Sequence, residues 1–323
     1  MFEIIFWTSA IVVGTAILVK GADMLVDSSG RAARYFGVPT IIVGLTLVAL
    51  GTSLPELASS LNATLIEKSG ISLGNVIGSN IANVLLVLGL TSVINPIDLE
   101  DGIFKREIPI MILVFIAFLF VLFTGETVNL LDGIFLLIFF LAYLFIFGKL
   151  ALKSEDRTKL EKEISDERYV DISDFEFKNE VFMIFISLFL VILGSQLLIK
   201  GSIFYLEEFN LTQSFVGLSI VSISTSLPEM AASASAAYKS ESDILLGNII
   251  GSNTFNILFV IGICSLFLPL AISTSVRIVS LVMLLSGLVL AIFMFTGKRL
   301  SRLEGIIMLI SYFIFLYVVY SWI

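Results

Sequence analysis

Two glutamates of this chain lie inside long apolar stretches, where a carboxylate is costly. The motif GTSLPE ends in Glu56, and the closely similar STSLPE ends in Glu229. A charged side chain at mid-bilayer depth costs roughly 2.5 to 3.5 kcal/mol on insertion scales, and such residues are functional candidates by default. Because both acids occur in the same motif, we expect them to form one intramembrane cation site.

Hydroxyl and carbonyl oxygens surround each glutamate. Thr52 and Ser53 lie four and three residues before Glu56, on the same face of a helix. Pro55 has no amide hydrogen to donate, so carbonyls around Ala49 to Thr52 are expected to lose their intrahelical partners. Together these groups are the oxygen ligands of a hard cation such as Ca²⁺. The second motif repeats the arrangement with Thr225, Ser226, Pro228 and Glu229.

A second pair of motifs adds further polar side chains. GNVIGSN recurs as GNIIGSN, and both motif pairs are 173 residues apart, so the chain contains a duplicated unit. Ser79 and Asn83 are four residues apart, as are Ser252 and Asn256, so each pair can face one cavity. In the alternative interpretation, the glycines form close helix-packing seams and the Ser and Asn side chains only bond between helices.

Composition places these motifs in a membrane protein. The chain of 323 residues is 58% hydrophobic and 14% charged, with a mean hydropathy of +1.05, which leaves too little polar surface for a soluble fold. Continuous apolar runs with Gly and Ser interruptions favour helices over barrel strands, so an all-α polytopic fold is predicted. Its ten transmembrane helices, near the length of about 20 residues that crosses a bilayer, are placed at 4–26, 38–64, 71–94, 108–124, 129–148, 181–206, 213–238, 244–269, 278–296 and 303–321.

Five predicted helices precede the midpoint and five follow it. The predicted domains are a first five-helix repeat at 1–148, a charged linker at 149–180 and a second five-helix repeat at 181–323. An odd number of helices makes the second repeat enter from the opposite face, and in such inverted repeats the substrate site lies near the midplane.

Charges in the loops predict the orientation. With both termini outside and the linker in the cytoplasm, the inner loops other than the linker hold eight Lys and Arg residues and the outer loops hold two. Because basic residues gather in cytoplasmic loops, this orientation is predicted. The linker holds ten acids and seven bases, and we expect it to be solvated and partly disordered, with regulatory cation binding as the alternative.

The motifs also resemble those of a known family. GTSLPE with GNVIGSNIAN, and STSLPE with GNIIGSNTFN, are similar to the two alpha-repeats of the sodium/calcium exchanger family, within the calcium/cation antiporter superfamily, and point to a prokaryotic member. The resemblance implies a secondary active antiporter of the cell membrane that exchanges Na⁺ for Ca²⁺ by alternating access, with helices 1 and 6 sliding against helices 2, 3, 7 and 8. The implied ion ligands are Glu56, Thr52, Ser53, Ser79, Asn83 and the carbonyl of Ala49, and in the second repeat Glu229, Thr225, Ser226, Ser252, Asn256 and the carbonyl of Ser222.

Three positions break the symmetry or the family pattern. Ser224 stands where the first motif has Gly51, and Ser222 where it has Ala49, so the second kink is expected to be stiffer and its sodium position more polar. Potassium-dependent relatives have a similar site with an aspartate at the position of Asn256. The neutral amide of Asn256 therefore argues against K⁺ coupling. Two ionised glutamates are neutralised by one Ca²⁺ or two Na⁺, and a third Na⁺, as in the family, would make transport electrogenic.

Other functions stay open at this point. A proton/calcium antiporter is the nearest alternative, because a buried glutamate can also carry a proton. The absence of histidine and the hydroxyls beside the acids favour sodium instead. A cation channel would need a continuous pore. An intramembrane hydrolase would need paired catalytic aspartates, a serine with a base, or a zinc site, and the chain has neither a histidine nor a membrane Asp pair. The expected partners are Ca²⁺, Na⁺ and the lipid bilayer, with no enzymatic activity, cofactor, nucleic acid or obligate protein partner.

Overall fold

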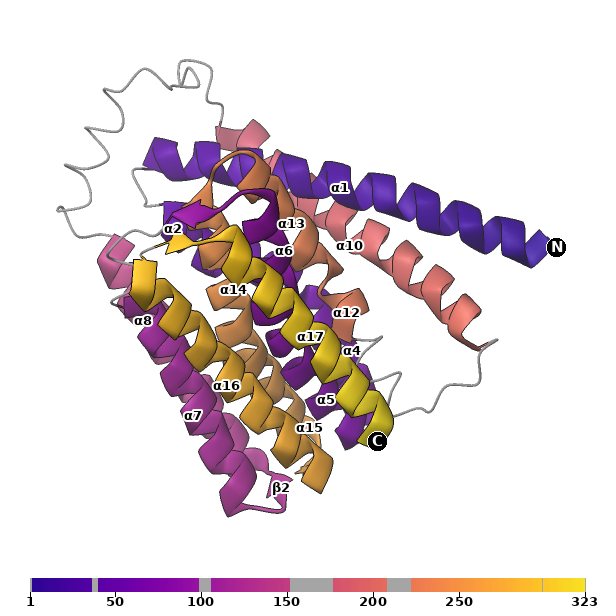
Figure 1. Cartoon of the computed structure of the whole chain (residues 1–323), viewed down its shortest axis with the longest axis vertical. Coiled ribbons are helices and arrows are strands. Elements are labelled where there is room, and N and C mark those ends of the chain that lie inside the picture. The colour runs from indigo at the N-terminus through magenta and orange to yellow at the C-terminus, as the bar shows by residue number, and fades with distance from the viewer. Residues whose placement is uncertain are drawn as a thin grey trace.

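The computed structural model describes residues 2–36, 40–98, 106–151, 177–207, 222–297 and 299–322, and these are mostly helical (Figure 1). The first half holds α1 (Phe2–Phe36), α2 (Thr40–Val43), the π-helix η1 (Gly44–Val48), α3 (Ala49–Thr52), α4 (Leu54–Leu65), α5 (Ser69–Ile81), the π-helix η2 (Ala82–Val87), α6 (Leu88–Ile94), α7 (Ile108–Thr124) and α8 (Leu130–Ala151). The second half holds α10 (Phe177–Glu207), α12 (Ser222–Thr225), α13 (Leu227–Tyr238), α14 (Ser242–Phe255), the π-helix η6 (Asn256–Ile261), α15 (Gly262–Phe267), α16 (Thr274–Gly297) and α17 (Arg302–Trp322).

Two short antiparallel ribbons connect the halves of the chain. β1 (Ile97–Asp98) pairs with β4 (Arg299–Leu300), and β2 (Thr127–Val128) pairs with β3 (Leu270–Ala271). The sequence analysis predicted no strands. Each strand is two residues long, which is too short for the alternation of apolar and polar residues that identifies a strand in a sequence.

Five helical stretches of the described chain are long and apolar enough to cross a membrane: Glu3–Ala32, Ser69–Ile94, Ser242–Phe267, Thr274–Phe295 and Arg302–Ser321. Ile108–Thr124 and Leu130–Ile146 are apolar but shorter. The predicted helical class is confirmed, while the count of ten crossings and the inverted repeats stay predictions. Residues 213–221 of one predicted span lie outside the described residues.

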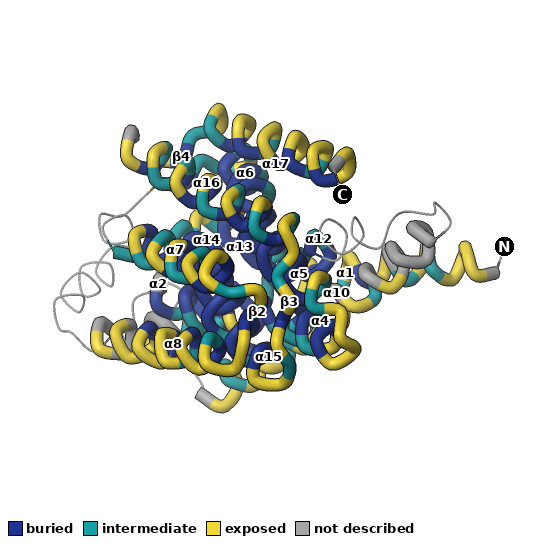
Figure 2. Tube along the Cα trace, turned by 90° about the horizontal axis from the view of Figure 1, so that it is seen from below, coloured by how far each residue is buried: buried dark blue, intermediate teal, exposed yellow. Residues whose placement is uncertain are grey.

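The stretches that carry the GNxxGSN motifs form the centre of the molecule. In Ser69–Ile94 and Ser242–Phe267, 78% and 83% of the apolar window is buried, against 39% and 28% in the windows of α16 and α17. Figure 2 shows the buried residues gathered in the middle of the bundle and the exposed residues along the outer sides of α8, α16 and α17. Large exposed side chains such as Phe295 and Tyr317 make this outer surface suitable for contact with lipid.

α1 and α10 pack closely against each other and extend together away from the bundle (Figure 1). A Cβ atom added at Gly194 of α10 would lie 2.5 Å from the backbone nitrogen of Leu18 in α1. Only glycine permits this approach of the two backbones. The two helices therefore form one pair, beside the buried centre.

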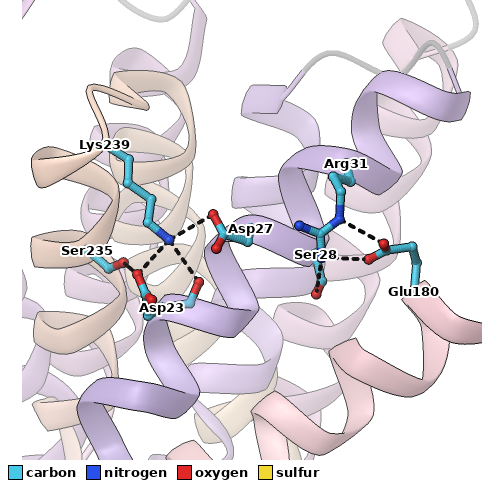
Figure 3. A network of polar contacts seen from close by, with 7 residues as sticks. All are labelled: Asp23, Asp27, Ser28, Arg31, Glu180, Ser235 and Lys239. Atoms are coloured by element: carbon cyan, nitrogen blue, oxygen red, sulfur yellow. Dashed lines mark hydrogen bonds and ion pairs between the residues drawn. The ribbon is translucent and has the colours of Figure 1, made fainter. Parts of the chain in front are cut away.

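Two groups of ion pairs fasten α1 to its neighbours (Figure 3). The Nζ atom of Lys239, at the end of α13, lies 2.5 Å from Asp23 Oδ1 and 2.7 Å from Asp27 Oδ1. It also donates a hydrogen bond to the backbone oxygen of Asp23. Arg31 donates to both carboxylate oxygens of Glu180, at 2.7 and 3.0 Å, in the bidentate geometry that makes such pairs specific.

The ends of the predicted charged linker are helical. α8 continues to Ala151 and α10 begins at Phe177, so Lys149 and Glu180 lie in helices. Composition alone groups Glu180 with the acids of the linker, but its contact with Arg31 ties the first turn of α10 to α1. Residues 152–176 lie outside the described residues.

Candidate cation-binding site

Each of the two motif glutamates lies in the first turn of a helix that follows a break. Ser53, with φ −86° and ψ 6°, separates α3 from α4, and Ser226, with φ −81° and ψ 3°, separates α12 from α13. Pro55 and Pro228 occupy the first turn of α4 and of α13, where a missing amide hydrogen costs little. The free N–H groups and the dipole of a helix start also favour a carboxylate. The prolines thus place both glutamates at helix starts.

The helix break at each motif leaves fewer backbone carbonyls without an intrahelical partner than the sequence predicts. The N–H of Ser53 still donates to the carbonyl of Ala49 at 3.0 Å, and the N–H of Ser226 donates to the carbonyl of Ser222 at 3.0 Å. The prediction that Ala49 loses its intrahelical partner is therefore wrong, because the turn closes through Ser53 before the chain leaves the helix. A carbonyl oxygen has two lone pairs, and each of these oxygens also accepts from the threonine of its own motif, at 3.3 Å from Thr52 and 3.2 Å from Thr225.

Glu56 and Glu229 are fully buried and are bonded across the two repeats. The hydroxyl of Ser53 donates to Glu229 Oε1 at 2.8 Å, and the hydroxyl of Ser226 donates to Glu56 Oε1 at 3.5 Å. Each motif therefore bonds the acid of the other motif. In the described part of the chain, no ion pair includes either glutamate. A buried carboxylate without a cation nearby is costly unless other groups compensate.

Thr52 and Thr225 bond to two asparagines that the sequence analysis did not single out. Thr52 Oγ1 lies 3.1 Å from Asn248 Oδ1, and Thr225 Oγ1 lies 3.0 Å from Asn75 Oδ1. Each amide also donates a hydrogen bond of 3.0 Å to a serine of α4 or α13. Both asparagines are the second residue of a GNxxGSN motif, so their recurrence was the signal that could have identified them.

Ser79 and Ser252 approach the motif of the other repeat. Ser79 Oγ donates to the carbonyl of Ser222, and Ser252 Oγ donates to the carbonyl of Ala49, both at 3.4 Å. Each serine also lies within 3.5 Å of the threonine hydroxyl of the facing motif. Each serine thus brings its hydroxyl beside a hydroxyl and a carbonyl of the predicted ligand set in the other repeat.

Four buried oxygens of the predicted ligand set have no hydrogen-bond partner among the described residues. They are Oε2 of Glu56, Oε2 of Glu229, Oδ1 of Asn83 and Oδ1 of Asn256. All four residues are 0% exposed. An unpartnered buried acceptor costs about 1 to 3 kcal/mol, and more when it is charged. Carboxylate and amide oxygens are ligands of hard cations, and a bound cation would supply the missing partner.

Glycine packing brings the elements of the site close together. A Cβ atom added at Gly251 of α14 would lie 2.6 Å from the backbone oxygen of Leu45 and 2.7 Å from Ala49 Cβ. The packing interpretation of this glycine is confirmed. The bond from the neighbouring Ser252 to the carbonyl of Ala49 also fits this interpretation, while an ion-facing role of the motif stays a prediction.

The chain is similar to known proteins both in sequence and in structure. The family model described as sodium/calcium exchanger protein matches residues 6–149 and 179–321. The chain is 33% identical to the sodium/calcium exchanger MaX1 of Methanosarcina acetivorans, over 96% of this chain and 97% of that protein. It is 34% identical to the inner membrane protein YrbG of Escherichia coli, over 81% of this chain and 80% of that protein. A solved structure of the sodium-calcium exchanger NCX_Mj, soaked with Na⁺ and Sr²⁺, matches with a TM-score of 0.81 at 30% identity, over 96% of this chain and 97% of that one. With its duplicated motifs and apolar helices, the chain therefore belongs to the sodium/calcium exchanger protein family.

Proposed function

We propose that this chain is a secondary active antiporter that exchanges Na⁺ for Ca²⁺ across the cell membrane by alternating access. The proposal depends on the four buried oxygens without donors, which come from Glu56, Glu229, Asn83 and Asn256. Matching positions of the duplicated unit supply them in pairs, as expected for a site between two repeats. Family membership and the similarity to MaX1 and NCX_Mj support the choice of ions.

The proposed ion ligands are oxygens of the two motif pairs. Side-chain oxygens and the two kink carbonyls together exceed the six to eight ligands that Ca²⁺ takes, which leaves room for Na⁺ at neighbouring positions. The full set comprises Ala49, Thr52, Ser53, Glu56, Ser79, Asn83, Ser222, Thr225, Ser226, Glu229, Ser252 and Asn256.

The same contacts support an inverted-repeat architecture. The bond from Ser53 to Glu229 has its counterpart in the bond from Ser226 to Glu56, and the other contacts of the site are paired in the same way. We therefore retain ten crossings in two five-helix repeats, with both termini outside and the charged linker in the cytoplasm.

Charge balance supplies the coupling between the ions. Two ionised glutamates give the site a charge of −2, which one Ca²⁺ or two Na⁺ neutralise. The empty site keeps a charge that is costly to move through a medium of low dielectric constant, so only loaded forms cross readily. A third Na⁺ would leave a charge of +1 and make exchange electrogenic. The neutral side chain of Asn256 adds no further charge, which favours exchange without K⁺.

Flux measurements in proteoliposomes test this function. An outward Na⁺ gradient should drive ⁴⁵Ca²⁺ uptake, and Glu56→Gln or Glu229→Gln should abolish it, because each removes half of the charge that neutralises Ca²⁺. Glu107→Gln is the matched control, since Glu107 is also buried, at 1% exposure, but is paired with Arg106 at 2.6 Å. Full uptake by either site variant would refute the assignment.

One observation makes a proton/calcium antiporter the second candidate. Both glutamates are buried outside any ion pair of the described residues, and such acids can carry protons. The same liposomes distinguish the two functions. Ca²⁺ uptake driven by a pH gradient in the absence of Na⁺ would select the proton antiporter, and uptake that requires Na⁺ selects the exchanger.

A further inference from the structure

Four buried asparagines form two hydrogen bonds between the central helical stretches. Asn256 Nδ2 donates to Asn80 Oδ1 at 3.1 Å, and Asn83 Nδ2 donates to Asn253 Oδ1 at 3.2 Å. All four side chains are 0% exposed. Asn80 and Asn83 lie in the stretch α5–η2, while Asn253 and Asn256 lie in α14–η6. Each bond therefore joins an asparagine of one repeat to an asparagine of the other.

The groups around Asn80 and Asn253 determine which way their own amides face. Asn80 Nδ2 donates to the backbone oxygen of Asn253 at 3.1 Å and to Met283 Sδ at 3.7 Å. Asn253 Nδ2 donates to Met111 Sδ at 3.6 Å. A carbonyl oxygen and a thioether sulfur accept hydrogen bonds but cannot donate them. The NH₂ end of each amide must therefore face these groups, and Oδ1 must face the asparagine of the other repeat.

This orientation propagates to Asn83 and Asn256. Because Oδ1 of the facing asparagine only accepts, each of these two amides must present its NH₂ group to it. Their own Oδ1 atoms then point away from the bond, and these are two of the four buried oxygens without a donor. An amide turned the other way would have nearly the same shape but would present NH₂ in place of oxygen.

We propose that Asn80 and Asn253 are positioning residues that orient the amides of Asn256 and Asn83, respectively, so that each turns an oxygen toward the transported cation. The inference rests on the proposed function and adds two residues to its machinery, neither of which contacts the ion. Removing the orienting bond lets the amide turn over, which exchanges an oxygen ligand for two N–H donors facing a cation. Loss of a partner that orients a metal ligand typically lowers affinity about 10-fold to 100-fold.

Calcium titration calorimetry on the detergent-solubilised full-length protein tests the first pair. Asn80→Ala should weaken Ca²⁺ binding about 10-fold or more. The loss should disappear when Asn256 is also changed to aspartate, because a carboxylate presents an oxygen in either orientation. The loss should persist in an Asn83→Asp background, because Asn83 is oriented by the other bond. Comparing each double variant with its own aspartate variant removes the effect of the added charge.

The second pair gives the mirror-image test. The loss caused by Asn253→Ala should disappear in the Asn83→Asp background and persist with Asn256→Asp. Unchanged affinity in both alanine variants would overturn the proposal. Losses that both aspartate backgrounds relieve equally, or that neither relieves, would overturn it as well.

A gentler variant covers the case in which alanine at these positions prevents folding. Met111→Leu nearly conserves volume, which cores tolerate well, but removes the acceptor that fixes Asn253. It should also weaken Ca²⁺ binding, and Asn83→Asp should again remove the loss. Unchanged affinity of Met111→Leu, or a loss that Asn83→Asp does not remove, would overturn the proposal.

The outcome is separable from the test of transport. If the unmodified protein binds Ca²⁺ but does not exchange it for Na⁺, the proposed exchange fails and the binding data still decide the role of the asparagines. If the unmodified protein binds no Ca²⁺, both proposals are overturned.

Discussion

Replacing Lys239 by glutamine should loosen the end of α1 that lies against α13. Lys239 contacts the side chains of Asp23 and Asp27 and the backbone of Asp23, and Figure 3 shows it between the two helices. Glutamine is shorter and neutral, so it removes both ion pairs while keeping a polar side chain at the same position. The expected result is more frequent local opening of α1 with the central stretches unchanged.

The magnitude follows from the exposure of the three side chains. Lys239 is 23% exposed, and Asp23 and Asp27 are 42% and 47% exposed. Partly exposed ion pairs contribute about 0.2 to 1 kcal/mol each. Two such pairs amount to about 1 kcal/mol, which corresponds to roughly a fivefold change in the equilibrium constant for local opening.

Hydrogen exchange followed by mass spectrometry measures this change. Backbone amides near Asp23 and Asp27 should exchange about fivefold faster in Lys239→Gln. Arg299→Gln is the matched control, because it removes an exposed ion pair with Asp98 that joins β4 to β1. Raising the salt concentration should narrow the difference between wild type and variant, since salt screens exposed pairs. Equal exchange of α1 in wild type and Lys239→Gln, or equal acceleration by Arg299→Gln, would refute the reasoning.

Three further results are expected. Ser53→Ala should weaken Ca²⁺ binding more than Ser226→Ala in calorimetric titrations, because the Ser53 hydroxyl lies 2.8 Å and the Ser226 hydroxyl 3.5 Å from a glutamate oxygen. A hydrogen bond to a charged group contributes about 1.5 to 3 kcal/mol. Equal losses in the two variants would contradict this prediction. Gly251→Ala should lower Tm, because a Cβ atom there would lie 2.6 Å from a backbone oxygen and overpacking costs about 1 to 3 kcal/mol. Gly70→Ala, with no atom within 4 Å of the added Cβ, is its control in the same thermal scan. Na⁺-driven Ca²⁺ uptake should be equal in K⁺ and in choline media, and a requirement for K⁺ would count against exchange by Na⁺ and Ca²⁺ alone.

Repetition in the sequence was sufficient to single out two glutamates that the structure buries completely. Glu56 and Glu229 occupy matching positions in two apolar stretches, where an unneeded carboxylate would be costly. The prolines one residue before them predicted helix breaks, and the structure has a break beside each. These features are local in the chain, so residue type and spacing reveal them.

Contacts between helices could not be predicted in the same way. Helical spacing places Ser53 beside Glu56, but its hydroxyl donates to Glu229. The π-helical segments η1, η2 and η6 were also not predicted, because they have no simple sequence signature. Neither the partner of a hydroxyl nor the orientation of an amide is encoded in the spacing along one helix, since both depend on the residue that packs opposite.

The distribution of contacts predicts which attachment would yield first under the proposed alternating access. Buried hydrogen bonds such as Ser53 to Glu229 and Asn256 to Asn80 cross between the two repeats, and breaking them would leave buried polar groups without partners. Partly exposed ion pairs, by contrast, fasten α1 to α13, and water can replace their contacts at little cost. If alternating access requires one part to shift, the weaker attachment should yield first. We therefore expect α1, with α10 packed against it, to move past a centre in which both repeats stay bonded to each other.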